Sequence, residues 1–516
     1  MVVGLDVGTT GVKAVAFGID TPWRYIAVRE YPLLQVAPGQ QVQDPAEILA
    51  ATHAALVECI AGAAGASVVA ISLSAAMHGL IALDDRYAPI TPLVTWADGR
   101  AGLEAAELAL DPGALDLQEA TGTPLHPMTP LAKLEWFRRH DPDTYSTARW
   151  WIGLKDYLLY WLTGTLATET SSASGTGLLG VVNRAWNPLA LAACGMEERR
   201  LPEILPTTAV LPLRSEIAAS LGVAAGTPVA VGAADGPLAN LGSGAVDPGV
   251  AGLSLGTSGA IRVLTEGPRP DRLGRVFCYA LVEPLWVAGG AISNGAEVLR
   301  WAARHLAPPT VDNRAGRFPE SQTGRLPDKR TGLGEHEDTM VDPTLGVAED
   351  SDGVVMLPFL LAERAPLWAP DLAAAFIGLR HHHGEAHMRR AAIEGVCVQM
   401  RLLLERVDAV HPVSSLRATG GAFRSPMWRR LMAAALERPM TVAGDEEGTA
   451  LGAAAVGLLA VGYSGSLTEA LATLSGLTGD NLRAEHIDPS TVATFRDLRA
   501  RTAVLVDALA RNVSSH

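Results

Sequence analysis

The chain has 516 residues, 48% of them hydrophobic and 19% charged, a length that favours about two to four globular domains with a large core. Its formal net charge of −14 argues against a nucleic-acid partner, and its four separated cysteines form no Cys-x-x-Cys pair, so neither a zinc knuckle nor a disulfide scaffold is supported. The sequence shows no signal peptide and no apolar run long enough to span a membrane, so we expect a cytoplasmic protein.

The first half of the chain alternates strand-like and helix-like segments. Residues 1–17 predict a β-hairpin with a glycine- and threonine-rich tip. Proline in the first turn supports a helix at 130–139. Gly164 ends a second predicted helix, which lies just before that glycine. The other predicted segments are strands 68–73 and 80–83, helices 101–110 and 156–162, strand 229–232 and helix 236–241.

The second half repeats this alternation, which predicts two α/β domains with mixed sheets and a ligand cleft between them. Residues 305–353 are polar and rich in Pro, Gly, Asp and Arg, and they predict a long loop excursion. The predicted segments are a hairpin at 252–264, strands 354–361 and 415–419, and helices 387–404, 426–436 and 449–461.

An internal repeat links the two halves. Gly-Leu-Asp-Val-Gly-Thr-Thr-Gly at residues 4–11 returns as Gly-Leu-Ser-Leu-Gly-Thr-Ser-Gly at residues 252–259. Either copy alone reads as an ordinary hairpin, but the pair indicates repeated structural units whose tips offer N–H groups and hydroxyls to an anion. Only the first copy carries a carboxylate, since Ser254 replaces Asp6. The repeat and the turn at 246–249 predict domains at 1–246 and 247–516.

Asp235 is the best candidate for a general base. It follows an apolar strand in Gly232-Ala-Ala-Asp-Gly236, and ligands of α/β sheets gather beyond the carboxyl ends of strands. A carboxylate there can take the proton of a hydroxyl that attacks a phosphoryl group. An equally plausible role is the N-cap of the next helix.

Two further loops offer sugar-binding groups. His78 ends a strand and could donate to a substrate oxygen or serve as a structural histidine. Trp96-Ala-Asp-Gly-Arg100 combines an indole, a carboxylate and a guanidinium, a set suited to carbohydrate-like ligands. Helix capping by Asp98 with Arg100 facing solvent is the alternative.

Other patterns define which cofactor classes are supported. Gly420-Gly421 lies between a strand and a helix and could let a nucleotide approach the backbone. No Gly-x-Gly-x-x-Gly follows a strand and no Walker loop is present, so neither a dinucleotide enzyme nor a P-loop enzyme is supported. His381-His-His383 is interpreted as a surface loop, because three adjacent residues cannot all face one ion.

Together these motifs resemble the FGGY carbohydrate kinase family, of the actin/hexokinase/Hsp70 superfold. The resemblance spans roughly residues 1–465, and segments 128–140 and 374–394 fit the two signatures of the family. Segments 74–78, 95–98, 122–130, 256–262 and 357–368 are most similar to the gluconate kinases. The resemblance implies an α/β fold of two actin/hexokinase/Hsp70-like (ribonuclease H-like) domains, with an N-terminal sugar-binding domain, a C-terminal nucleotide-binding domain and a catalytic cleft between them.

The resemblance also implies roles for individual residues. Asp235 is the catalytic base and a second candidate for contact with magnesium, which Asp6 orients through water. The implied sugar pocket contains Met77, His78, Trp96, Asp98 and Asp235. The implied ATP contacts are Thr9, Thr10, Gly256, Thr257, Gly295, Gly421 and Ser425, where Ser425 departs from the asparagine of some relatives.

The expected reaction is transfer of the ATP γ-phosphoryl group to a terminal hydroxyl of an open-chain sugar acid, best D-gluconate, with ATP and Mg²⁺ required. A pentulose such as xylulose is the alternative substrate. An actin- or Hsp70-like ATPase and a silent sugar sensor are less favoured rivals, and a homodimer is left open. Candidate partners for the substrate carboxylate are His78, Arg100, His126 and Lys155.

Overall fold

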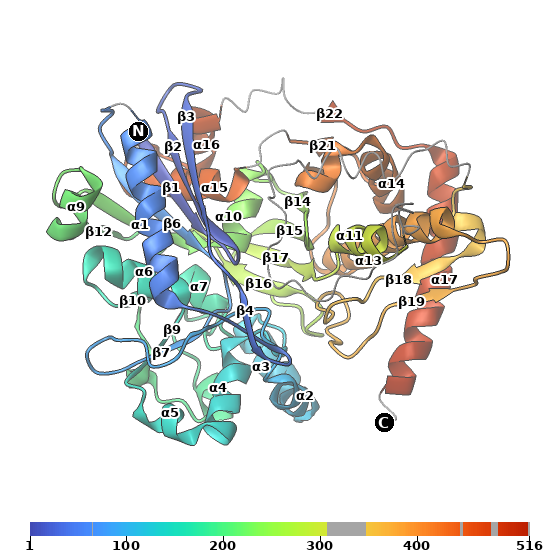
Figure 1. The fold of residues 1–516 in the computed structure, drawn as a ribbon, viewed down its shortest axis with the longest axis horizontal. Helices are drawn as coiled ribbons and strands as arrows, with labels where there is room; N and C mark the ends of the chain where they lie inside the picture. The colour runs from blue at the N-terminus through green and yellow to red at the C-terminus, as the bar shows by residue number, and fades with distance from the viewer. Residues whose placement is uncertain (64, 307–346, 444–446, 476–482, 514–516) are drawn as a thin grey trace, which may run out of the picture.

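The computed structural model describes residues 1–63, 65–306, 347–443, 447–475 and 483–513, and it contains two mixed sheets side by side (Figure 1). In the first sheet the central strand pairs parallel with one neighbour and antiparallel with the other. In spatial order its strands are β12 (Val210–Pro212), β13 (Pro228–Ala234), β6 (Ala70–Ala75), β1 (Val2–Val7), β2 (Gly11–Phe17) and β3 (Arg24–Glu30).

The second sheet repeats this strand order with strands from the second half of the chain. Its central strand likewise has one antiparallel and one parallel neighbour. In spatial order its strands are β16 (Phe277–Ala280), β17 (Leu285–Ile292), β15 (Gly259–Glu266), β14 (Val250–Leu255), β20 (Ser415–Thr419), β21 (Met440–Val442) and β22 (Arg483–Ala484).

The internal repeat therefore corresponds to equivalent hairpins, β1–β2 and β14–β15. The second turn is one residue tighter, because Val7 pairs with Val12 whereas Leu255 pairs with Gly259. The two-domain α/β fold of the actin/hexokinase/Hsp70 type is confirmed by this order and by the structural neighbours described below.

Helices α10 (Asp235–Gly242) and α15 (Gly448–Ala460) pack between the two sheets (Figure 1). Glycine allows their backbones to approach closely, since a Cβ on Gly242 would meet the carbonyl oxygen of Gly448 at 1.7 Å. On the other side, a Cβ on Gly4 of β1 would meet the carbonyl oxygen of Ala450 at 2.1 Å. Helix α15, from the second half of the sequence, is thus part of the core beneath the first sheet.

The remaining elements surround these two layers. The helices are α1 (Pro45–Gly62), α2 (Gly102–Leu110), α3 (Ala114–Thr121), α4 (Pro130–His140), α5 (Pro142–Thr147), α6 (Leu154–Thr163), α7 (Thr170–Ser174), α8 (Pro188–Ala193), α9 (Ser215–Leu221), α11 (Glu297–Leu306), α13 (Glu385–Val410), α14 (Pro426–Leu436), α16 (Leu467–Ser475), α17 (Pro489–Val513) and the short helices η1 (Glu198–Arg200), η3 (Ser351–Gly353) and η4 (Gly421–Arg424). The small sheets are β4 (Leu34–Ala37) with β5 (Gln40–Gln43) and β8 (Leu93–Val94), β7 (Ile81–Leu83) with β9 (Trp150–Ile152), β10 (Ala167–Glu169) with β11 (Glu203–Leu205), and β18 (Val355–Leu357) with β19 (Ala375–Ile377).

Most predicted elements are present, with two clear corrections. The strand expected at 354–361 ends at Leu357, because Pro358 has no N–H to continue the ladder. The helix expected at 387–404 runs from Glu385 to Val410. The predicted excursion at 305–353 lies largely on 307–346, outside the described residues.

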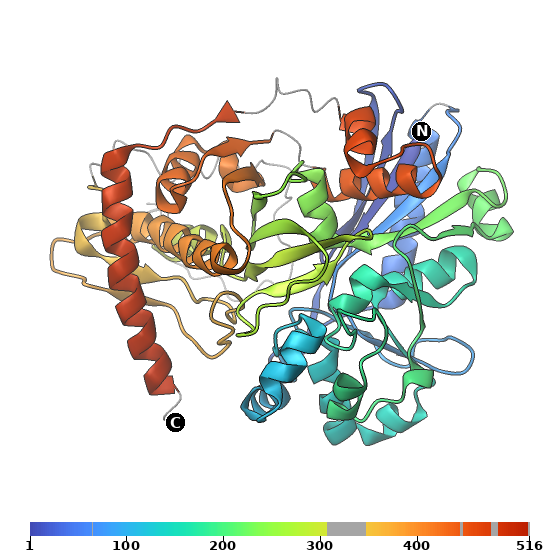
Figure 2. The same ribbon diagram turned by 180° about the vertical axis from the view of Figure 1, so that it is seen from behind.

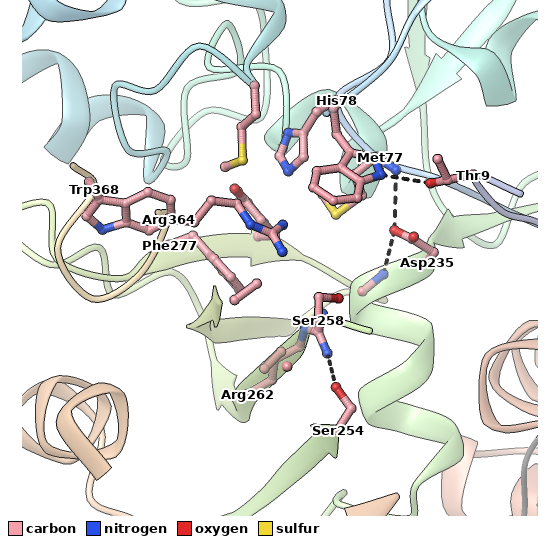
Figure 3. A pocket seen from close by; sticks show the side chains of 17 residues that line it. Thr9, Met77, His78, Asp235, Ser254, Ser258, Arg262, Phe277, Arg364 and Trp368 are labelled. Carbon is pink, nitrogen blue, oxygen red and sulfur yellow. Dashed lines mark hydrogen bonds between the residues drawn. The ribbon is translucent and has the colours of Figure 1, made fainter. Parts of the chain in front are cut away.

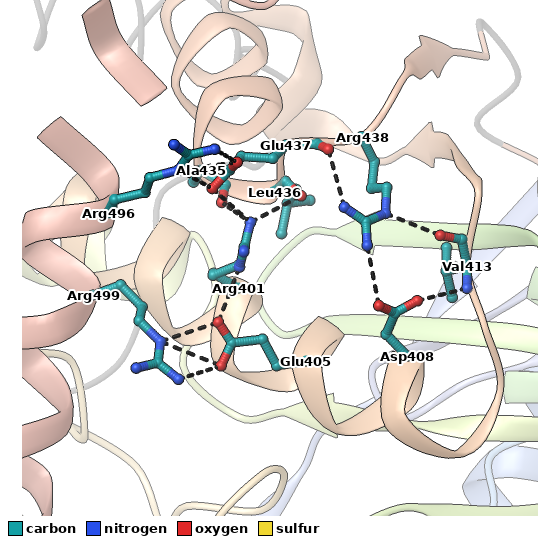
Figure 4. Close-up of polar contacts among 10 residues, drawn as sticks. All are labelled: Arg401, Glu405, Asp408, Val413, Ala435, Leu436, Glu437, Arg438, Arg496 and Arg499. Carbon is teal, nitrogen blue, oxygen red and sulfur yellow. Dashed lines mark hydrogen bonds and ion pairs between the residues drawn. The ribbon is translucent and has the colours of Figure 1, made fainter. Parts of the chain in front are cut away.

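Helix α17 lies along one side of the second domain (Figure 2), where ion pairs join it to α13 and α14. Arg499 donates to Glu405 of α13 at 2.6 Å, and Arg496 pairs with Glu437 at 2.5 Å (Figure 4). Arg401 connects the two carboxylates, since its guanidinium contacts both. Within the described residues, no helix is long and apolar enough to cross a membrane.

Candidate active site

A cavity of about 210 Å³ lies between the two domains, with residues of both hairpins in its wall (Figure 3). Thr9 comes from the first hairpin, and Ser254 and Ser258 come from the second. The volume is below the roughly 300–1,000 Å³ of sites for drug-sized ligands, so it suits a small substrate. The predicted residues Met77, His78, Trp96 and Asp235 also line it.

Asp235 is held at the first turn of α10 by two backbone donors. Its Oδ1 accepts hydrogen bonds from the N–H of Gly236 at 2.8 Å and of Met77 at 3.3 Å. Because both bonds go to Oδ1, Oδ2 is left to face a ligand. Burial raises the pKa of Asp235, while the charge of Arg262 opposes the rise. A raised pKa makes a carboxylate a better proton acceptor near neutral pH.

Asp6 lies close enough to Asp235 for their charges to interact. Burial, and then the negative charge of Asp235, raise the pKa of Asp6 to about 7, although Lys13 and a 3.3 Å hydrogen bond from Ser74 favour ionisation. A cation would relieve this repulsion, and carboxylate oxygens are the ligands that Mg²⁺ prefers. These residues therefore fit the magnesium implied by the resemblance.

His78 has a strained backbone and a fixed tautomer. Its φ of 65° is unusual for a residue with a side chain, and such strain concentrates at functional sites. Nδ1 donates to the carbonyl of Gly175 at 2.7 Å, and burial lowers the pKa of the ring to about 3. The neutral ring therefore presents Nε2 as an acceptor, which corrects the expectation that His78 donates to a substrate oxygen.

Lys133 fixes the two loops that carry His78 and Trp96. Its Nζ is buried and donates to the carbonyl oxygens of His78 and Thr95, both at 2.7 Å. Burial lowers its pKa to about 7. Lys133 is therefore a positioning residue on α4, inside the signature-like segment 128–140.

Two buried guanidinium groups that were not predicted as site residues line the cavity. Arg364 lies 4.6 Å over the ring of Trp96 and is held by Ser293 Oγ at 3.1 Å and the carbonyl of Ile292 at 3.0 Å. Arg262 makes one long bond of 3.4 Å to Ser254, and its buried Nε has no hydrogen-bond partner among the described residues. A buried donor without a partner is costly, so Arg262 is suited to an anionic ligand, and Arg364 adds a second positive charge to the same cavity wall.

Several predicted pocket residues are engaged elsewhere. The carboxylate of Asp98 is 1% exposed and accepts both guanidinium bonds of Arg100 at 2.8 Å, besides the N–H of Gln41 at 2.7 Å. Asp98 therefore braces its own loop, and Arg100 is occupied by Asp98. Lys155 is buried in an ion pair with Glu169.

His126 lies behind the cavity wall rather than in it. Its ring packs edge-on against Trp368 with centroids 5.7 Å apart, and burial lowers its pKa to about 3. Of the four candidate carboxylate partners, only His78 lines the cavity, and it is neutral. The cations that do line it are Arg262 and Arg364.

The predicted nucleotide contacts gather around the carboxyl ends of the central strands β14 and β20 of the second sheet. Gly421 follows β20, which pairs parallel with β14 and so brings it beside Gly256. A Cβ on Gly295 would meet the carbonyl oxygen of Gly256 at 2.7 Å, so glycine is required for this close approach. Arg300 donates to the hydroxyl of Thr257 at 2.8 Å, and Ser425 is buried at the start of α14.

The first hairpin presents its two threonines differently. Thr10 is exposed at the tip, whereas Thr9 Oγ1 accepts a 2.7 Å hydrogen bond from Trp96 Nε1. Trp96 belongs to the predicted sugar pocket and Thr9 to the predicted phosphate-binding hairpin. Their hydrogen bond therefore connects the two predicted binding regions.

Glu363, next to Arg364, is a buried carboxyl group whose protonation makes the stability of the protein depend on pH. It is fully buried and accepts from Gln399 at 2.6 Å and Asn294 at 3.2 Å, yet burial raises its pKa from 4.5 to about 8. The folded protein therefore holds a proton at pH 5–8 that the unfolded chain releases, and its stability falls as pH rises, by up to about 1.4 kcal/mol per pH unit.

We expect Glu363→Gln to remove this dependence, so the melting temperature of wild type should fall relative to that of the variant from pH 5 to pH 8. Glu405→Gln is the matched control, because the pKa of Glu405 lies below its ordinary value. Thermal unfolding followed by circular dichroism measures the difference. Parallel pH profiles for wild type and Glu363→Gln would show that Glu363 is ionised when folded.

Comparison with known proteins finds relatives along nearly the whole chain. The N-terminal domain model of the FGGY family of carbohydrate kinases matches residues 1–242, and the C-terminal domain model matches residues 251–461. The gluconokinase of Bacillus subtilis (strain 168) is 35% identical over 492 residues, which cover 94% of this chain and 92% of that enzyme. The xylulose kinase of Escherichia coli (strain K12) is 30% identical over 485 residues, covering 92% of this chain and 93% of that enzyme. The crystal structure of gluconate kinase from Lactobacillus acidophilus matches with a TM-score of 0.85 at 29% identity, over 99% of this chain and 98% of that one.

Proposed function

Because this chain belongs to the FGGY family of carbohydrate kinases and is a phosphotransferase acting on a sugar, we propose that it phosphorylates an open-chain sugar acid. The best candidate is D-gluconate, converted to 6-phosphogluconate with ATP as donor. The sugar binds in the cavity, mainly against the first domain, residues 1–246, with its carboxylate at Arg262 and Arg364 of the second domain. The nucleotide binds against the second domain, residues 247–516.

The observation that supports a sugar acid is the pair of buried guanidinium groups in the cavity. Arg262 and Arg364 line it, and burial lowers the pKa of Arg364 to about 10 without making it neutral at physiological pH. A carboxylate would satisfy their open N–H groups through charge-assisted bonds. A neutral ketose offers the two guanidinium groups only uncharged acceptors, which form weaker hydrogen bonds to a cation than a carboxylate does.

Asp235 carries the proton transfer in this proposal. The terminal hydroxyl of the substrate donates to Asp235 Oδ2, which takes its proton as the oxygen attacks the γ-phosphorus of ATP. The bond from that phosphorus to the β–γ bridging oxygen breaks, and ADP leaves. Thr9 and Thr10 of the first hairpin and Gly256 and Thr257 of the second hold the phosphates from opposite sides. Rate enhancement then arises mainly from positioning and electrostatic stabilisation.

Asp6 and Asp235 are the residues that would hold Mg²⁺. When bound, the ion supplies positive charge against the phosphate oxygens of ATP. Gly295, Gly421 and Ser425 face the adenosine in this proposal, at the edge where β14 and β20 end. The neutral acceptor at His78 Nε2 takes a hydrogen bond from a substrate hydroxyl.

A pentulose remains the second candidate substrate because the chain is also 30% identical to a xylulose kinase. ADP release should be measured with purified protein, ATP and Mg²⁺ across a panel of polyols, ketoses and sugar acids. We expect the highest kcat/KM with D-gluconate and little ADP release without sugar. A higher value with D-xylulose would favour the pentulose, and ADP release independent of any sugar would contradict a sugar kinase.

A further inference from the structure

A group of histidines and one aspartate lies at the start of α13, built from residues that do not line the kinase cavity. Asp352 comes from η3, and His382 and His383 come from the turn before α13. One potential ligand atom from each of the three lies within 4.8 Å of the others. The adjacent histidines alone cannot all face one ion, but the fold brings a carboxylate from a distant segment beside two of them.

The distances are close to those of a metal site. His382 Nε2 lies 2.8 Å from Asp352 Oδ2, and His383 Nε2 lies 3.7 Å from the same oxygen. Nitrogen and oxygen ligands sit about 2.0–2.2 Å from Zn²⁺, so they are roughly 3–4 Å apart around one ion. The ring of His387 lies nearby, with its centroid 5.1 Å from that of His383, and its Nδ1 accepts a hydrogen bond from the N–H of Gly384 at 3.1 Å.

The backbone around Asp352 is strained in a way that presents its carboxylate to the histidines. Asp350, Ser351 and Asp352 have φ values of 77°, 50° and 54°. Such runs persist only when surrounding contacts enforce them. Glu394 supplies these contacts, since it accepts from Ser351 Oγ at 2.7 Å and from the N–H of Asp350 at 3.2 Å.

The tautomer of His383 determines which hydrogen bonds must break before a metal ion can bind to it. The N–H of Arg380 donates to His383 Nδ1 at 2.8 Å, so Nε2 carries the proton and donates to the carbonyl of Asp352 at 3.1 Å. A metal on His383 Nε2 places that proton on Nδ1, and the Arg380 N–H must turn away. The side chains of His382 and Asp352 are 56% and 55% exposed, so an ion reaches the cluster from solvent.

From this geometry we infer that Asp352, His382 and His383, with His387 adjacent, bind a borderline divalent cation such as Zn²⁺ or Ni²⁺. Imidazole donors favour these ions over Mg²⁺ and Ca²⁺, which prefer oxygen ligands. The site is separate from the carboxylates of the kinase cavity. A bound ion links the turn at η3 to the start of α13 and stabilises the folded protein by mass action.

The test uses the full chain, stripped with EDTA and dialysed into buffer with excess Mg²⁺ so that oxygen-ligand sites are saturated. Zinc binding is measured by equilibrium dialysis, and the melting temperature is measured with and without Zn²⁺. The double variant Asp352→Asn with His382→Gln removes two ligands. His486→Gln is the matched control, because His486 is exposed and outside the cluster.

We expect wild type and His486→Gln to bind zinc and to gain several degrees in melting temperature. The double variant should lose both effects while melting like wild type in EDTA. If the double variant is unstable in EDTA, His382→Gln alone supplies the comparison. Zinc binding and stabilisation equal to wild type in the variant that folds, or neither effect in wild type, would overturn the inference. Neither readout depends on kinase activity.

Discussion

Replacing Asp235 by asparagine is expected to lower kcat for sugar phosphorylation by about 10²–10⁴, the usual contribution of a general base. Asparagine keeps an oxygen for the backbone N–H groups of Met77 and Gly236, so the local structure should persist. The amide cannot take the proton of the attacking hydroxyl. Steady-state kinetics with D-gluconate and ATP, with nucleotide affinity measured by calorimetry, give the two readouts.

Measured without Mg²⁺, the nucleotide affinity of Asp235→Asn should stay close to that of wild type, because the proposed adenosine contacts lie on the second domain. Asp84→Asn is a suitable control, since Asp84 caps an exposed turn through the N–H groups of Arg86 and Ala88. Near-normal turnover by Asp235→Asn would require another base.

The second large effect is expected from Arg364→Met, which should lower kcat/KM for D-gluconate about 30- to 4,000-fold. Truncating one partner of a buried charge pair costs about 2–5 kcal/mol, and each 1.4 kcal/mol is a factor of ten. Methionine retains part of the stacking on Trp96 but supplies no donor for a carboxylate.

A neutral polyol separates loss of recognition from loss of structure. D-Glucitol has a hydroxymethyl group where D-gluconate has its carboxylate, so Arg364→Met should narrow the ratio of kcat/KM between the two. Arg262→Met tests the other guanidinium in the same way. An equal loss on both substrates in both variants would mean that the arginines support the fold rather than the carboxylate.

Much of the fold could be predicted from the sequence because its signals are local. The repeated Gly-rich octapeptide predicts two equivalent hairpins, and β1–β2 and β14–β15 are those hairpins. Helix α1 received no prediction, although its buried residues Ile48, Thr52, Ala55, Leu56 and Cys59 recur at helical spacing and could have revealed it.

The site was predicted where its residues end strands. Met77, His78 and Asp235 do meet in one cavity, because parallel strands β6 and β13 end at the same edge. Trp96 follows β8 of another sheet and is held at the cavity by its hydrogen bond to Thr9. The pairing of Asp98 with Arg100 was not predicted, since two residues of spacing allow a ligand site and an internal ion pair equally.

Arg364 was harder to predict as a site residue because the residue that it contacts, Trp96, lies far from it in the sequence. Arg364 reaches Trp96 across the cleft, a contact that depends on how the two domains meet. Arg262 did carry a local signal, since it is a charge within the apolar strand β15, where burial of a charge is costly without a partner. A charged residue inside an apolar strand therefore indicates a ligand or an ion pair on the basis of sequence alone.

The proposed activity is tested most directly by identifying the product formed from D-gluconate labelled with ¹³C at C6, the carbon that carries the terminal hydroxyl. We expect phosphorus coupling to that carbon in the nuclear magnetic resonance spectrum, with one ADP formed per ester. ADP formation without an ester, an ester at another carbon, or an ester formed from D-xylulose but not from D-gluconate would contradict the proposal.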